Sequence, residues 1–281
     1  MITALLKDVF YGVCRLRGWD PLTVTVSASE RAVIAERVSD RLKIGWNYAW
    51  WPELTIVEQR RYAADWVAET TYGTGDKVWH EDAYWKSLAD GNIGHEPADG
   101  SEYWGEPGAD WRRIVNFRQS GQYEIGSVDL RYCMFEEDPL LARNPMPIAG
   151  VRIYGNGLLA PPEAPDEPWV RYRPPAPRVS WTEWVAGTAY SIGDLAYVTS
   201  AGVCYRANAA TTGQNPPDNP TVWIPVQFPE FLRRYVVIGA YADGLLEREE
   251  YWKYEGKAVA ELEELEDRLI DQQMSRKVRF G

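Results

Sequence analysis

The sequence has little cysteine and histidine, with 3 Cys and 2 His in 281 residues. Cys14, Cys133 and Cys204 are far apart, which excludes a disulfide framework and a zinc site built on paired cysteines. No apolar run approaches the roughly 18 residues that a membrane-spanning helix needs. Residues 1–20 lack the charged, then apolar, then small-residue pattern of a signal peptide. These absences predict a protein of intracellular origin that does not cross a membrane.

Positive charge is also scarce, because the net charge is -11 at pH 7. A general nucleic-acid binder needs a basic face, so this class is disfavoured. What the chain has in excess is 14 Trp, 17 Tyr and 19 Pro. Ten of the prolines lie between Pro139 and Pro177, which excludes a helix there and favours extended chain. The chain therefore reads as two helical ends around a long non-helical middle.

The N-terminal end predicts helices. Ser27 and Glu30 form a capping box that opens a second helix, and residues 53–62 are compatible with a short third one. The apolar residues of the first helix recur at helical spacing: Leu5, Leu6, Val9, Phe10 and Val13.

The C-terminal end predicts one long helix or a helical hairpin broken near Gly239–Gly244 or Gly256. Its apolar residues follow a seven-residue spacing: Phe231, Ile238, Leu245, Trp252 and Val259. Such a pattern packs along partner helices, either within the same chain or in a neighbouring copy.

The middle of the chain contains an internal repeat with an offset of 118 residues that drifts to 120 and 119. Each copy spans about 40 to 45 residues of short strands and turns, which predicts a small antiparallel β module whose Trp and Tyr side chains supply most of the burial. The matched pairs are Trp66 with Trp184, Tyr72 with Tyr190, Gly75 with Gly193, Asp76 with Asp194, Trp79 with Tyr197, Trp85 with Tyr205, and Trp104 with Trp223.

The sequence thus predicts an α+β fold: a helical bundle built from the N- and C-terminal helices, with two small antiparallel β modules and an extended β region inserted between them. The expected parts are an N-terminal helical part (1–62), a first module (63–111), an extended region with a Pro-rich linker (112–178), a second module (179–227) and a C-terminal long helix (228–281).

The modules resemble the small chitin- and carbohydrate-binding modules attached to glycosidases. The resemblance rests on Tyr-x-x-Gly-Asp and on Tyr205-Arg-Ala-Asn-Ala-Ala-Thr-Thr-Gly-Gln-Asn-Pro216. It implies sugar stacking on aromatic side chains, for which the candidates are Trp79, Trp85, Tyr197 and Tyr205. Ala209 and Ala210 stand where the family has its stacking tryptophans, which favours a packing or decorative role for the modules.

The sequence offers no catalytic motif, metal site or cofactor site, and we expect a protein that is not an enzyme. His80, Glu81, Asp82 and His95 lie within one module and are the nearest approach to a metal cluster, with a solvated hairpin tip as the favoured alternative. As neighbours on a predicted strand, His80 and Glu81 are expected to point to opposite faces. No nucleophile stands at a recognisable spacing from a base.

The two ends resemble the head-to-tail adaptor (connector) proteins of tailed bacteriophages. The resemblance rests on four segments: Trp46-Asn-Tyr-Ala-Trp-Trp-Pro-Glu53, Glu58-Gln-Arg-Arg-Tyr62, Trp169-Val-Arg-Tyr-Arg-Pro-Pro-Ala-Pro177 and Val236-Val-Ile-Gly-Ala-Tyr-Ala-Asp243. It implies a virion protein, assembled in the host cytoplasm, whose ring of about twelve copies lies under the portal and joins it to tail or nozzle proteins. Packaged DNA would pass through without specific binding, as an acidic chain permits.

The adaptor resemblance assigns roles to two sets of residues. The basic tip Arg276, Lys277 and Arg279 is a candidate portal or DNA contact, with a frayed, solvated terminus as the alternative. The candidate ring-packing seam is Ile238, Leu245, Trp252 and Val259. The alternative function is a carbohydrate-binding tail-fibre or decoration protein that contacts host surface glycans.

Overall fold

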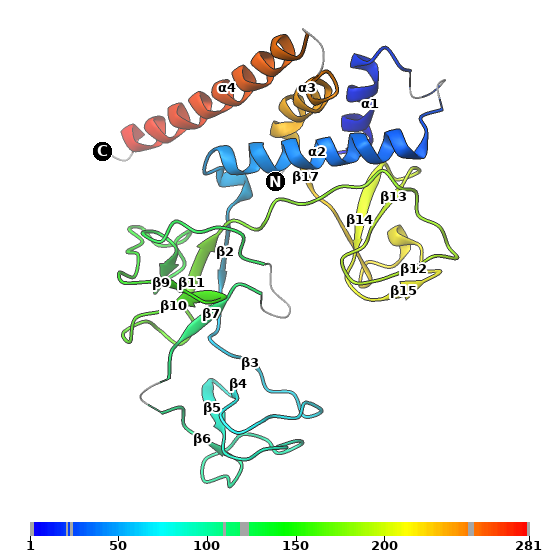
Figure 1. The fold of residues 1–281 in the computed structure, drawn as a ribbon. Helices are drawn as coiled ribbons and strands as arrows, with labels where there is room; N and C mark the ends of the chain where they lie inside the picture. Colours follow the sequence, from blue (N-terminus) through cyan, green and yellow to red (C-terminus); the bar gives the residue numbers. More distant parts are fainter. Residues whose placement is uncertain are drawn as a thin grey trace. The chain divides into compact units, whose positions relative to one another are not determined.

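The computed structural model describes residues 3–279 except 21, 23–24, 109–110, 119–123 and 247–249, and for residues 272–279 it describes the backbone alone. The fold is α+β, with helices toward both ends of the chain and several small sheets between them (Figure 1). This confirms the predicted class at that level. The chain divides into two compact units, the terminal unit (residues 1–54 and 176–281) and the inserted unit (residues 55–175).

The helices of the terminal unit come from both halves of that unit. They are α1 (Leu6–Leu16), α2 (Ala28–Tyr48), α3 (Arg233–Asp243) and α4 (Glu250–Arg279). The predicted capping box opens α2, where the Glu30 amide donates to Ser27 Oγ at 3.2 Å and the Ser27 amide donates to Glu30 at 3.1 Å. All four helices bury residues in one core: Val9, Phe10, Val13, Ile34, Val38, Leu42, Tyr235, Val236, Ala240, Ala258 and Leu262.

The C-terminal region is a hairpin, because α3 ends at Asp243 and α4 begins at Glu250. Of the alternatives that the sequence left open, this is the break beside Gly244. Arg234 near the start of α3 pairs with Glu261 at 3.1 Å, and Asp243 and Glu255 share one arginine. The two helices therefore run antiparallel.

The second module belongs to the terminal unit and packs on α1. Its strands are β12 (Ala189–Tyr190), β13 (Leu195–Val198), β14 (Val203–Ala207), β15 (Thr211–Thr212) and β16 (Trp223–Pro225), with the 3-10 turn η2 (Pro216–Asp218). Phe10 stacks on Trp181 at 4.4 Å and meets the Tyr197 ring edge-on at 5.8 Å between centroids. The Lys7 amide donates to the Gly202 carbonyl at 3.1 Å.

Short elements complete the terminal unit. Strand β1 (Thr3–Ala4) pairs with β17 (Phe228–Pro229), which ties the start of the chain to the segment before α3. The 3-10 turns η1 (Pro52–Leu54) and η3 (Glu230–Leu232) follow α2 and precede α3.

The inserted unit holds the first module and two three-stranded sheets, ordered β2-β11-β8 and β7-β10-β9. Their strands are β2 (Ile56–Gln59), β7 (Ile114–Asn116), β8 (Met134–Phe135), β9 (Arg152–Tyr154), β10 (Gly157–Leu159) and β11 (Trp169–Tyr172). The first module has β3 (Ala64–Asp65), β4 (Lys77–His80), β5 (Ala83–Ser87) and β6 (Trp104–Gly105).

The prediction of a short third helix over residues 53–62 is wrong, because this segment contains the end of η1 and then strand β2. Ile56 and Val57 are β-branched and pair with Tyr172 and Arg171 of β11, from more than a hundred residues away along the chain. A distant strand partner therefore decides the conformation of this segment.

The internal repeat is confirmed by matching hydrogen bonds. Asp76 and Asp194 each accept from a backbone amide three residues earlier, at 2.7 Å in both modules. Gly75 and Gly193 have φ of 94° and 93°, a conformation that glycine adopts without strain. The two modules are therefore the same local fold.

Candidate functional site

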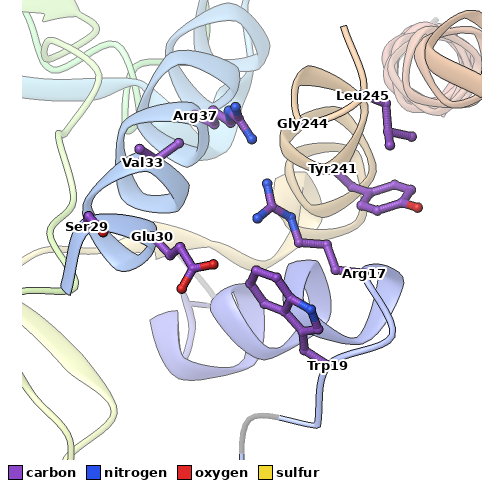
Figure 2. A pocket seen from close by; sticks show the side chains of 9 residues that line it. All are labelled: Arg17, Trp19, Ser29, Glu30, Val33, Arg37, Tyr241, Gly244 and Leu245. Carbon is purple, nitrogen blue, oxygen red and sulfur yellow. The ribbon is translucent and has the colours of Figure 1, made fainter. Parts of the chain in front are cut away.

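The terminal unit has a pocket of about 430 Å³ where the end of α1, the first turns of α2 and the end of α3 meet (Figure 2). Its lining combines cationic, aromatic and hydroxyl groups with a few apolar side chains: Arg17, Trp19, Ser29, Glu30, Val33, Arg37, Tyr241, Gly244 and Leu245. We call it the arginine pocket.

Two arginines converge on the C-terminus of α3. Arg17 is the residue after α1, and Arg37 lies on α2. The end of α1 and one face of α2 therefore hold the two side chains near the end of α3. A Cβ at Gly244 would lie 2.7 Å from Arg17 Nη2 and 2.9 Å from Arg37 Nη1, so the glycine leaves room for both. Cations at a helix C-terminus are stabilised by the partial negative charge of its carbonyl groups.

Neither guanidinium forms an ion pair with a carboxylate among the described residues. Glu30 is the acidic side chain at the pocket, and its carboxylate accepts from the Ser27 amide and hydroxyl. Arg17 instead lies over the Trp19 ring at 5.1 Å. Burial, and then the charge of Arg37, lower the pKa of Arg17, although a guanidinium stays protonated in a protein. The pocket therefore presents two positive charges to an incoming anion.

A different arginine has a structural role. Arg41 on α2 is 6% exposed and pairs with Asp243 of α3 and Glu255 of α4, with Nε to Asp243 at 2.8 Å and Nη1 to Glu255 at 3.0 Å. Hydrogen bonds to Asp243 raise the pKa of Arg41 despite its burial. A Cβ at Gly239 would lie 2.7 Å from Arg41 Cδ, so the glycine on α3 admits the side chain. This cluster locks three helices together.

The four candidate sugar-stacking aromatics divide into two pairs. Trp79 and Tyr197 are 6% and 1% exposed, and each packs against the core of its own unit. Trp85 and Tyr205 are half-buried on β5 and β14, where each packs against the small core of its module. None of these four described side chains is fully exposed.

The candidate ring-packing seam does not form one stripe, because the seven-residue pattern crosses the break between α3 and α4. Leu245 is 5% exposed, and Ile238 packs against the core. Trp252 and Val259 are instead 75% and 41% exposed on α4. The side chains of the basic tip Arg276, Lys277 and Arg279 lie outside the described residues.

The expectation that His80 and Glu81 point apart is wrong. β4 ends at His80, and Glu81 has a positive φ of 45° in the following turn, which breaks the alternation of a strand. Ligand atoms of His80, Glu81 and Glu96 lie within 4.8 Å of one another, with His80 Nε2 at 3.1 Å from Glu96. These side chains could reach one divalent cation, although Glu96 is largely exposed and is already the partner of His80.

Sequence reasoning missed the arginine pocket because its residues come from three separate segments. Arg17 follows a helix with no special spacing, and Arg37 sits among ordinary charged positions of α2. The one available signal was the pairing of Arg17 with Trp19 beside the Gly18 that ends α1. The contact of these arginines with the end of α3 depends on the tertiary fold and leaves no local signal in the sequence.

Compared with known proteins, the sequence matches no family model and no curated protein. Among the described residues, no helix combines the length and the apolar character that crossing a membrane requires.

Proposed function

We propose that this chain is a virion structural protein, a head-to-tail adaptor that forms a ring under the portal and links it to the tail. The observation that carries the proposal is that the terminal unit is built from both ends of the chain. Residues 1–54 and 176–281 fold together, while residues 55–175 form a unit of their own. A helical part assembled from both ends that tolerates an inserted β unit is what the adaptor resemblance implies.

The terminal helix supports this proposal by its length. α4 packs on the core through Ala258, Leu262, Leu265 and Leu269, and it continues to Arg279. The segment after Leu269 is thus available to dock on a neighbouring protein such as the portal. We assign the basic tip to this contact and the modules to positions outside the ring.

The test is native mass spectrometry of the purified chain, alone and mixed with the portal from the same virion. We expect a monomer that becomes a closed ring on the portal, with the roughly twelve copies that the adaptor resemblance implies. A chain that ignores the portal contradicts the proposal and would direct attention to host glycans, for which a glycan array is the next measurement.

A truncation after Leu269 sharpens the test, because it leaves the core residues of α4 in place. We expect the truncated chain to stay folded by circular dichroism and to lose portal binding. The matched variant Arg276→Gln, Lys277→Gln, Arg279→Gln keeps the helix and removes only charge. Portal docking that survives both changes contradicts the role of the C-terminal end.

A further inference from the structure

The outer face of α4 is strongly acidic. Residues 261–271 contain six acidic side chains and a single arginine. The exposed ones lie on the face opposite Ala258, Leu262, Leu265 and Leu269, which pack on the core. We call this set the acidic face: Glu263, Glu264, Asp267 and Asp271.

The acidic face and the arginine pocket lie toward opposite ends of helix α2. Ser29 and Glu30, at the start of α2, line the pocket. Tyr48, the last residue of α2, lies beside the acidic face, since the charges of Glu266 and Glu263 help to raise its pKa after desolvation. Glu30 and Tyr48 are separated by roughly 27 Å along the helix at 1.5 Å per residue. The terminal unit thus carries opposite charges toward its two ends.

Each charged surface has exposed apolar side chains next to it. Trp252, Val259 and Ile270 are 75%, 41% and 45% exposed along α4, on the flank of the acidic face. Val33 at the pocket and Leu246 just after it are 41% and 65% exposed. Exposed apolar side chains beside complementary charges are typical of protein–protein contacts.

We propose that the arginine pocket of one copy receives carboxylates from the acidic face of α4 of a second copy, in a head-to-tail contact. Because the two surfaces differ, the contact is heterologous, and its repetition closes a ring when the rotation between copies allows it. The inference rests on the proposed function in taking the closed ring as its product. It also replaces the seam expected from the sequence, half of which is buried.

The chemistry favours a carboxylate of a second copy over a nucleic-acid phosphate. Guanidinium groups bind carboxylates through paired hydrogen bonds, and two of them here have no ion-pair partner among the described residues. A duplex would have to approach a chain of net charge -11, with Glu30 at the same pocket. A carboxylate on an exposed helix reaches the pocket without bringing a long polyanion near this charge.

The experiment uses two complementary variants of the full chain. The pocket variant carries Arg17→Glu and Arg37→Glu, and the helix variant carries Glu263→Lys and Asp267→Lys. Two double variants, Arg178→Glu with Arg206→Glu and Glu53→Lys with Glu137→Lys, are charge-matched controls at exposed positions outside both surfaces. Thermal unfolding of every variant verifies that the fold is kept. Sedimentation velocity at low ionic strength and native mass spectrometry on the portal measure assembly.

We expect each variant alone to associate at least about tenfold more weakly than the wild type, because close charge pairs at interfaces contribute strongly. An equimolar mixture of the two variants should recover assembly with the variants alternating, because both contacts between unlike variants join opposite charges, whereas contacts between copies of the same variant join like charges. Added salt should weaken wild-type association. Variants that assemble like the wild type, or like the two controls, overturn the inference.

The outcomes separate this inference from the proposed function. A wild-type ring on the portal that the pocket variant also forms overturns the head-to-tail contact and leaves the adaptor role standing. A wild type that ignores the portal but self-associates through the two surfaces overturns the adaptor role alone. A wild type that is monomeric in both settings overturns both.

Discussion

The two β modules share one local fold and differ in how each is attached. In both, a tryptophan of the last strand donates its indole N–H to a carbonyl, from Trp104 to His95 at 2.7 Å and from Trp223 to Gln214 at 3.0 Å. The equivalent positions Trp79 and Tyr197 instead pack on different cores, the first beside Tyr84 and the second beside Phe10. The shared turn and the buried tryptophan, Trp104 or Trp223, define the module. Trp79 or Tyr197 instead attaches the module to the core of its unit.

The surfaces of the modules differ as well. Residues 62–111 contain 11 acidic residues and 2 lysines, whereas residues 181–226 contain 3 acidic residues and 1 arginine. Charge on an exposed surface affects solubility and the choice of partner rather than the fold. The first module therefore keeps its architecture under a much larger negative charge.

The largest expected effect comes from Trp104→Ala and Trp223→Ala. Both side chains are at most 2% exposed, and each meets the tyrosine of its module edge-on, at 5.3 Å and 5.1 Å between centroids. We expect each change to cost about 4 kcal/mol of module stability, as for other buried aromatic residues. Hydrogen exchange of the Gly75 and Gly193 amides measures it. One module that tolerates the change while the other does not would contradict their equivalence.

A slightly smaller effect is expected from Trp79→Ala and Tyr197→Ala, which remove the attachment and leave the turn. We expect a loss of about 3 kcal/mol in the unit concerned. For Tyr197→Ala, exchange should increase at the Lys7 amide, which donates to Gly202, while the Gly193 amide stays protected. Equal deprotection of both amides would show that this position belongs to the module core.

Much of the module fold, but not the way each module is attached to its unit, could be predicted from the sequence. The repeat can be predicted because its turn residues and its tryptophan are local features of the sequence, and the capping box at Ser27 and Glu30 is local in the same way. The attachment roles of Trp79 and Tyr197 could not be predicted, since an aromatic on a strand face has the same pattern whether a sugar or a protein core covers it. Strand β2 and the arginine pocket were missed because their partners are distant in sequence.

The two units can also be compared through a buried thiol in each, Cys133 in the inserted unit and Cys204 in the terminal unit. Burial raises the pKa of both Cys133 and Cys204 to about 11, against an ordinary value of 9.0. The unfolded chain loses these protons first, so the stability contributed by each thiol is present below pH 9 and lost as the pH rises toward 11. The expected slope is about 1.4 kcal/mol per pH unit for each thiol.

Urea unfolding at a series of pH values measures this dependence. Cys133→Ala and Cys204→Ala are matched controls, because each removes one titrating group and keeps a small apolar side chain. We expect each control to lose its share of the slope in its own unit. An unchanged slope in Cys204→Ala would mean that other groups account for the alkaline loss.

The smallest effect is expected from Asp76→Ala and Asp194→Ala, at about 1 kcal/mol each. Both side chains are exposed and accept one backbone amide hydrogen bond at the same turn. The thermal midpoints of the two variants should fall by similar amounts. A much larger fall for Asp194→Ala would show that this turn supports more than its own module.

The discontinuity of the terminal unit also sets the order in which the chain can fold during its synthesis. Phe10 packs against Trp181 and Tyr197, and α2 packs against α3 and α4, all of which are synthesised much later. The apolar faces of α1 and α2 therefore stay uncovered until the last segments leave the ribosome. The inserted unit is complete much earlier, at residue 175. More than 200 residues separate the end of α2 at Tyr48 from the core residues Ala258 and Leu262 of α4. At roughly 5 to 20 residues per second, the early helices are therefore exposed to chaperones and to aggregation for about 10 to 40 s.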